Sequence, residues 1–460
     1  MGGFNFGYPS DDEIWEKISS DDINSRVEGL LDAARKVGFR DGNPLQAFNY
    51  LEPACSLADE VNDFVGLAHC YHLMGGMHAR LKQWDKCVAV HEAGADAGKR
   101  SFRADLEVDH LAFAARAAIH LGDVVAVRRN FELAITLGSE NSYWNVDGLR
   151  AEYGRFLRKQ GDMVSARKYL EAASASELEM PYAMASAELI SVLLGSGDAA
   201  GALTVARELH SYASYGEIDH LKNKASYGIA KALISLGQYD AALKEIDELV
   251  ENGESSLKHK VRVDLLRAEA LMGLDRNSEA LTIFARALPL LTKFKLWESL
   301  GDALRIRAHL HWEMGNELDT EADSYAAIEA YEKSGNDSRV SAGQLSLADL
   351  LSKRGNWAEV ERLTGFVVDN VLQMFETWYP SALGLCALAK AKLGRGDEAL
   401  ELASRLFEYK HLIPAVAANG YHAQAIVYGG VKGRNLAAKA MKGYLANGFT
   451  EMATDASSLI

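Results

Sequence analysis

The stretch Ile234-Ser235-Leu236-Gly237-Gln238-Tyr239-Asp240-Ala241-Ala242-Leu243 decides the fold, because its pattern recurs along most of the chain. The residues before Gly237 are typical of the end of a helix, and glycine readily takes the left-handed conformation that closes one. A second helix then begins, with Ala242 as its first inward residue. The stretch therefore predicts two antiparallel helices joined by a tight turn.

Turn residues equivalent to Gly237 recur at intervals of 36 to 40 residues. The eleven predicted turn positions are Gly42, Lys82, Gly122, Gly161, Gly197, Gly237, Asp275, Gly315, Gly355, Gly394 and Gly433, with a mean spacing of about 39 residues. Five residues after the turn, seven of the eleven residues are alanine, and seven residues before it, eight are glycine or alanine. Small residues at both places allow the two helices of a hairpin to cross closely.

The turn Gly237-x-Tyr239-x-x-Ala242 and its relatives Gly161-Asp162 and Gly355-Asn356-Trp357 resemble those of tetratricopeptide (TPR) repeats, over roughly residues 22 to 448. The resemblance implies an all-α fold, a right-handed α-solenoid of about eleven stacked antiparallel helix hairpins that form a TPR-like superhelix. A usual TPR unit has about 34 residues, so this chain resembles a long-repeat variant with longer helices. Most units also lack the proline that commonly ends the second helix.

The same register divides the chain into three segments. We expect an N-terminal tail and short capping helix over residues 1–21, the solenoid over residues 22–448, and a polar C-terminal tail over residues 449–460. TPR-like arrays have many unrelated roles, so the resemblance defines a fold and leaves the function open.

Composition excludes several classes of protein. The chain has 460 residues, 48% of them hydrophobic and 25% charged, which is typical of a folded protein and not of a disordered one. The net charge of −15 argues against nucleic acid or an anionic membrane as the main partner. The N-terminus lacks a secretory signal, no apolar segment is long enough to span a bilayer, and the four cysteines have no disulfide spacing, so we expect a cytoplasmic protein.

The first helices of TPR-like hairpins line the concave face, and positions 13, 10, 6 and 3 residues before each turn share one side of such a helix. In units two to eight these positions hold many basic and aromatic residues, although the fifth unit contributes none. They are His69, His72, Arg116, Arg155, Arg158, Lys224, Tyr227, Lys231, Arg262, Arg305, His309 and Trp312.

We infer from this stripe a groove for an acidic peptide segment or one with a free C-terminal carboxylate. Arginine and lysine would donate charge-assisted hydrogen bonds, and Tyr227 and Trp312 would provide stacking surfaces. The alternative is that the basic residues pair with Asp109, Glu269 and Asp302, which lie on the same stripe, and with other acids between adjacent units.

Motifs for catalysis or cofactor binding are weak. The segment from Gly195 to Gly201 looks like a nucleotide loop, but its spacing is wrong and no strand precedes it. His69, His72 and His78 suggest a metal site, yet no further cysteine or carboxylate has the spacing of a ligand. We therefore expect no catalytic residue, no cofactor and no metal.

The leading interpretation is a non-enzymatic scaffold or adaptor that recognises a protein or peptide segment in the concave groove. The alternative is a ligand-responsive, peptide-sensing regulator without its own DNA-binding module, because the segment before Gly42 is too short and acidic to be one. A helical-repeat enzyme is a third interpretation. Basic residues of the last unit and the acidic N-terminus permit head-to-tail self-association, although surface charge alone explains both.

Overall fold

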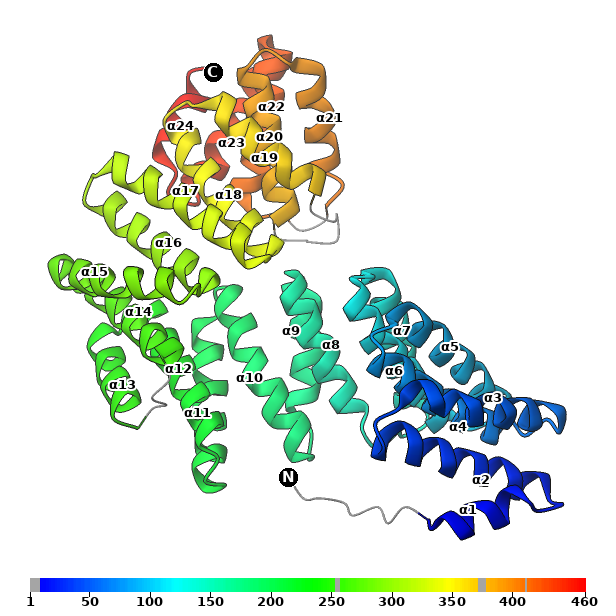
Figure 1. Cartoon of the computed structure of the whole chain (residues 1–460). Helices are drawn as coiled ribbons and strands as arrows, with labels where there is room; N and C mark the ends of the chain where they lie inside the picture. The colour runs from blue at the N-terminus through cyan, green and yellow to red at the C-terminus, as the bar shows by residue number, and fades with distance from the viewer. Residues whose placement is uncertain (1–8, 253–256, 371–377, 410–411) are drawn as a thin grey trace. The chain divides into compact units, whose positions relative to one another are not determined.

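The computed structural model describes residues 9–252, 257–370, 378–409 and 412–460, and every regular element in these ranges is a helix (Figure 1). The chain divides into two compact units. Unit 1 comprises Met1–Tyr153 with Ser176–Pro181, and unit 2 comprises Gly154–Ala175 with Tyr182–Ile460. The boundary falls inside helix α8 (Val146–Gln160), so the N-terminal half of this helix belongs to unit 1 and the C-terminal half to unit 2.

Unit 1 is a series of helices in which consecutive members from α2 to α7 pack against each other. Before α8 its elements are α1 (Asp11–Ile18), α2 (Ile23–Arg35), the π-helical turn η1 (Lys36–Arg40), α3 (Pro44–Glu60), α4 (Phe64–Arg80), α5 (Trp84–Arg100), α6 (Ala104–Leu121) and α7 (Val124–Glu140). The even-numbered helices are the first helices of successive hairpins, and α2 contacts α4 as α4 contacts α6.

Unit 2 continues the same pattern, with consecutive helices packed together from α11 to α24. Beyond α8 the elements are α9 (Met163–Ser174), α10 (Glu179–Gly195), α11 (Ala199–Tyr215), α12 (Asp219–Ser235), α13 (Tyr239–Asn252), α14 (Leu257–Gly273), α15 (Asn277–Lys293), α16 (Trp297–Glu313), α17 (Glu317–Ser334), α18 (Asp337–Lys353), α19 (Trp357–Asn370), α20 (Trp378–Lys392), α21 (Gly396–Leu406), α22 (Pro414–Tyr428), α23 (Gly430–Leu445) and α24 (Thr450–Ser457). The first helix of one hairpin also contacts the first helix of the next hairpin. For example, α12 contacts α14, and α14 contacts α16.

The predicted turns are confirmed from Gly42 to Gly394, since every residue assigned to a turn in this range has a positive φ. Gly237 has φ +71°, and the next amide, of Gln238, donates to the carbonyl of Leu233 at 2.9 Å. Several turns also carry the cap of the following helix. Asp123 comes directly after Gly122, and its carboxylate accepts from the amide of Ala126 at 3.0 Å. A left-handed residue followed by an N-cap thus sets where one helix ends and the next begins.

The last predicted turn is wrong. Gly433 lies inside α23 and is buried, and the turn before this helix is made by Gly429 and Gly430, with φ +58° and +55°. Gly433 is small for a different reason, because an added Cβ would lie 2.8 Å from the carbonyl oxygen of Ala425 on the facing helix. The register therefore breaks in the last hairpin, and Ala438, expected to face inward, is exposed.

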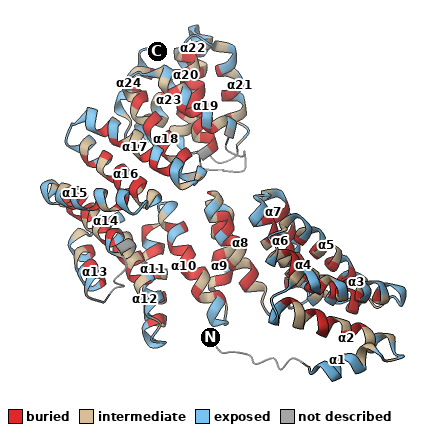
Figure 2. Cartoon of the chain, in the orientation of Figure 1, coloured by how far each residue is buried: buried red, intermediate tan, exposed pale blue. Residues whose placement is uncertain are grey.

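Small residues bring the helices of each hairpin together. From Ala47 to Ala399, all ten residues five positions after a turn are buried, and Ala242 is fully so. At Gly154 an added Cβ would lie 2.6 Å from Leu170 of the paired helix. Buried residues consequently follow the seams between helices along the chain (Figure 2), as expected for an array in which each repeat contacts its neighbours.

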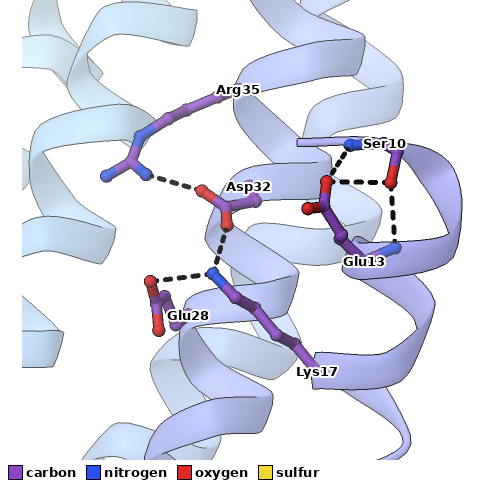
Figure 3. Close-up of polar contacts among 6 residues, drawn as sticks. All are labelled: Ser10, Glu13, Lys17, Glu28, Asp32 and Arg35. Atoms are coloured by element: carbon purple, nitrogen blue, oxygen red, sulfur yellow. Dashed lines mark hydrogen bonds and ion pairs between the residues drawn. The ribbon is translucent and has the colours of Figure 1, made fainter. Parts of the chain in front are cut away.

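The first helix, α1, lies against α2 through a small polar network (Figure 3). A capping box starts α1, in which Ser10 accepts from the Glu13 amide at 3.2 Å and the Glu13 carboxylate accepts from the Ser10 amide at 2.7 Å. Lys17 then pairs with Asp32 at 3.0 Å, and Asp32 also pairs with Arg35. Residues 1–8 of the predicted N-terminal segment lie outside the described residues.

The C-terminal segment, expected from sequence to be a polar tail, contains helix α24. Met452, Ala453 and Ala456 of this helix are buried, and Asp455 pairs with Lys392 of α20 at 2.7 Å. The difference arises because three apolar residues with the spacing of one helical face are enough to pack against α23. Among the described residues, no helix combines the length and apolar character needed to cross a bilayer.

Candidate functional site

The predicted stripe residues lie on the first helices of their hairpins and belong to two sets. His69 and His72 on α4 and Arg116 on α6 are in unit 1, and the remaining nine, on α8, α12, α14 and α16, are in unit 2. A single groove that runs through all the hairpins stays a prediction.

In unit 2, three predicted cations surround one carboxylate, that of Glu188 on α10. Arg158 Nε lies 2.7 Å from Glu188 Oε2, while Lys224 Nζ and Arg155 Nε lie 3.4 Å and 3.8 Å from Glu188 Oε1. These four residues form the Glu188 cluster. It joins α8, α10 and α12, which are the first helices of three successive hairpins.

The Glu188 cluster has an excess of positive charge. Burial raises the pKa of the Glu188 carboxyl, but Arg158 and Lys224 outweigh burial, so its pKa lies below the usual value and the group is ionised at neutral pH. The Glu188 side chain is only 10% exposed, whereas those of Arg155 and Lys224 are 50% and 48% exposed. One buried negative charge thus holds three cations, two of which keep N–H groups available to solvent.

The positive surface continues along α12 and α14. Tyr227 follows Lys224 by almost one helical turn, and the guanidinium of Arg262 lies 4.4 Å from the centroid of the Tyr227 ring. Lys231 lies one turn further along α12 and is not fully buried, and its ammonium has no partner among the described residues. The cationic surface is defined as the Glu188 cluster together with Tyr227, Lys231 and Arg262. Glu269, two turns after Arg262 on α14, is an acid at its edge.

The predicted residues of α16 make local contacts. His309 Nε2 lies 3.3 Å from the carboxylate of Glu313 one turn later on the same helix. Trp312 is partly exposed and has the Lys353 ammonium 5.7 Å from its ring centroid. Arg305 is exposed and has no ion pair among the described residues. No recorded side-chain contact within the described residues joins these three to the cationic surface.

In unit 1, Arg116 and His72 line a cavity. The guanidinium of Arg116 makes a bidentate pair with Glu152 of α8, at 2.7 and 2.9 Å, so its charge is already compensated. His72 packs edge-on against His91 and Phe113. The described residues include no group of three or more histidine, cysteine or acidic side chains arranged to hold an ion.

Ion pairing differs in detail from the alternative drawn from sequence. Asp109 accepts from Tyr143 at 2.5 Å, and Asp302 accepts from Tyr331 and pairs with Arg339. Arg116, Arg155 and Arg158 pair with other acids on the first helix of the next hairpin, which is the other part of that alternative. Glu152 and Glu188 are the two acids involved, and both lie nine residues before their turn, at Gly161 and Gly197.

Sequence reasoning missed Glu152 and Glu188, although the register contains the signal. Nine residues before the turn, the other first helices mostly carry apolar residues such as Phe113, Leu266 and Ile306. A carboxylate at this inward position is costly unless a cation compensates it, so it indicates a nearby arginine or lysine.

Comparisons with known proteins concern the fold. No protein family and no curated protein sequence matches the chain. Among solved structures, a STAND ATPase with a tetratricopeptide repeat sensor from Pyrococcus horikoshii is 16% identical, with a TM-score of 0.47; the match covers 78% of this chain and 56% of that one.

Two further solved structures are similar. A Rap protein in complex with competence and sporulation factor is 14% identical with a TM-score of 0.45, over 77% of this chain and 97% of that one. The quorum sensor NprR from B. thuringiensis is 13% identical with a TM-score of 0.48, over 69% and 91%. The chain's own paired helices, turn register and repeat length make it a TPR-like repeat protein, an α-solenoid of the long-repeat kind.

Proposed function

We propose that the chain is a non-enzymatic binding module that takes up an acidic peptide segment of a partner protein on the cationic surface of unit 2. The observation that carries the proposal is the Glu188 cluster, in which one buried carboxylate orients three cations and leaves two of them half exposed. Preoriented arginine and lysine side chains bind carboxylates with less loss of side-chain entropy than mobile ones.

The geometry of α12 favours an extended acidic segment. Lys224 and Lys231 are seven residues apart, which places them about 10.5 Å apart along the helix. A peptide in the polyproline II conformation advances about 3.1 Å per residue with three residues per turn, so carboxylates at every third residue share one face and lie about 9.3 Å apart, close to this separation. Between the two lysines, the stacked Tyr227 and Arg262 provide a flat surface that lies against the peptide backbone.

Fluorescence anisotropy with a labelled peptide tests the proposal. The probe is a fluorescein-labelled peptide with glutamate at every third residue and alanine elsewhere, and the comparison peptide carries lysine at the same places. The acidic peptide is expected to bind and to lose affinity as NaCl is added, because exposed charge pairs are screened. Amidating its C-terminus shows whether side-chain carboxylates suffice.

Lys231→Ala and Lys244→Ala form a matched pair of variants. Lys231 belongs to the cationic surface, whereas Lys244 is exposed on α13, the second helix of its hairpin. Loss of Lys231 should weaken binding of the acidic peptide about threefold to fivefold, as expected for one exposed charge pair, and loss of Lys244 should not. Equal effects of the two substitutions, or equal affinity for the acidic and basic peptides, would rule against this surface.

A further inference from the structure

A cavity of about 210 Å³ lies in unit 1 among α4, α5, α6 and η1. Its walls include the aromatic rings of Phe39, Trp84 and Phe113 and the polar side chains of His91, His120 and Arg116. Pockets for drug-sized ligands are larger, about 300–1,000 Å³, so this cavity has the size for a single side chain.

Two pairs of stacked rings line the cavity. Trp84 and His120 stack with their ring centroids 4.0 Å apart and their planes 12° apart. Phe113 and His91 stack at 5.2 Å and 20°. Gly75 completes the wall beside His91, because a Cβ at this position would overlap the His91 ring. A lining rich in aromatic rings favours an aromatic occupant.

The hydrogen bonds of two buried histidines fix which nitrogen carries a proton. His110 Nε2 lies 3.0 Å from the carbonyl oxygen of Ala68, which can only accept, so His110 is protonated at Nε2. His91 Nδ1 lies 3.1 Å from His110 Nδ1, and one of these two atoms must donate. Because His110 is neutral with its proton on Nε2, His91 donates from Nδ1 and its Nε2 carries a free lone pair.

Both histidines are neutral at physiological pH. Burial, together with a smaller effect of neighbouring histidines, lowers the pKa of His91 to about 3 and that of His110 to about 4. His91 Nε2 has no hydrogen-bond partner among the described residues, so it is available as an acceptor at the cavity wall. Arg116 is compensated by Glu152 and adds no demand for an anion.

We propose that this cavity binds an aromatic ring that carries one hydrogen-bond donor, as the phenol of tyrosine or the indole of tryptophan does, from a peptide partner. The ring lies among the aromatic lining residues and its O–H or N–H donates to His91 Nε2. A phenyl ring has the shape but leaves the His91 acceptor unsatisfied, so the site discriminates against phenylalanine. This site is separate from the cationic surface, and its existence does not depend on the function proposed for that surface.

Nitrogen-15 NMR of the histidine side chains in the full chain tests the proposal. The probes are p-cresol and 3-methylindole, which carry the donor, and toluene, which has the size of p-cresol without it. The first two should bind about fivefold more tightly than toluene, the difference that one hydrogen bond makes. Their binding should also shift the resonance of one histidine nitrogen that lacks a proton, and the His91→Phe variant should lack that resonance.

His91→Phe keeps an aromatic ring in place and removes the acceptor, so it should bind p-cresol and toluene equally. N-acetyl-tyrosinamide distinguishes a peptide side chain from a free small molecule as the source of the ring, because a site for a peptide side chain must admit the flanking amides. Exclusion of N-acetyl-tyrosinamide would overturn the peptide partner. The site would be overturned if toluene bound to the unmodified chain as tightly as p-cresol, or if no probe bound. Both results are obtained with the unmodified chain, so they do not depend on the folding of a variant.

Discussion

Replacing Glu188 by glutamine should make the chain bind an acidic peptide more tightly while making it less stable. Glu188 is the negative charge beneath Arg155, Arg158 and Lys224. A peptide carboxylate on the outer side of Arg155 or Lys224 would lie roughly 7 Å from Glu188, two ion-pair lengths away. The repulsion between the two carboxylates at this distance is about 0.6 kcal/mol at the dielectric constant of water and about 2.4 kcal/mol at an effective value near 20.

Because Arg155 and Lys224 are half exposed, the lower part of that range applies, and Glu188→Gln should tighten binding by about 1 kcal/mol, or about fivefold. The amide oxygen of glutamine still accepts from Arg158, whereas its NH2 group replaces the oxygen that contacts Arg155 and Lys224, so these two cations are released toward the peptide. The free energy of unfolding should fall by about 1–3 kcal/mol, because three cations lose the charge that compensates them.

Anisotropy titrations with the labelled acidic peptide measure the first effect, and urea denaturation measures the second. Glu152→Gln is the matched control, since Glu152 has the same register position in unit 1 and holds Arg116 in the same way. It should leave the peptide affinity nearly unchanged. Weaker binding by Glu188→Gln, with its helicity intact, would refute the reasoning, and so would an equal gain in Glu152→Gln.

Three further predictions concern stability, each measured by urea denaturation. Gly237→Ala should lower the free energy of unfolding by about 1–2 kcal/mol, because φ at this residue is +71°. Gly365→Ala, inside α19 and with equal space for a Cβ, should raise it by about 0.5–1 kcal/mol. A change of the same sign in both variants would contradict the role of the turn. Gly94→Ala should cost about 1–3 kcal/mol, because the Cβ overlaps the His110 ring, and an unchanged stability would contradict that packing. His91 and His110 have folded-state pKa values of about 3 and about 4, below the unfolded value, so their contribution to stability is complete above about pH 6.5 and is lost as pH falls toward about 4. At about pH 5 the contribution of each histidine to the free energy of unfolding should be smaller by about 2 kcal/mol. A free energy of unfolding that stays constant down to this pH would contradict the burial of two neutral histidines.

The fold could be predicted from sequence because the turn residues report a local requirement. A left-handed backbone at Gly237 and its equivalents depends on a few neighbouring residues, and the small residues that flank each turn repeat with it. Gly433 shows where this reasoning fails. A glycine is needed both at a turn with positive φ and at a place where a facing carbonyl comes close, as at Gly433. The presence of a glycine in the sequence does not show which of these two reasons applies.

The candidate site could be predicted only in part. The stripe placed Arg155, Arg158 and Lys224 on first helices, where the structure brings them together around one carboxylate. The stripe does not include Glu188, because its four positions follow from the TPR resemblance and Glu188 lies nine residues before its turn, at an inward-facing position. Pairing between helices depends on side-chain reach and on the angle at which helices cross, and neither is written in a single repeat.

The aromatic cavity could not be predicted from the stripe, because His91 and Trp84 lie on the second helix of their hairpin. Helical periodicity places His91 on a buried face, where a histidine most often serves as a core residue. Its free acceptor appears only once Ala68, His110 and His91 are placed together, and these residues come from three helices.

Zero-length crosslinking of the acidic peptide to the full chain tests the central claim most directly. A carbodiimide joins a peptide carboxylate to a lysine amine only where the two are in contact, and mass spectrometry locates the bond. Crosslinks are expected at Lys224 and Lys231, with few at Lys244, which is exposed but lies on the second helix of its hairpin. Crosslinks spread evenly over the exposed lysines, or concentrated away from α12, would contradict the binding of an acidic segment on the cationic surface.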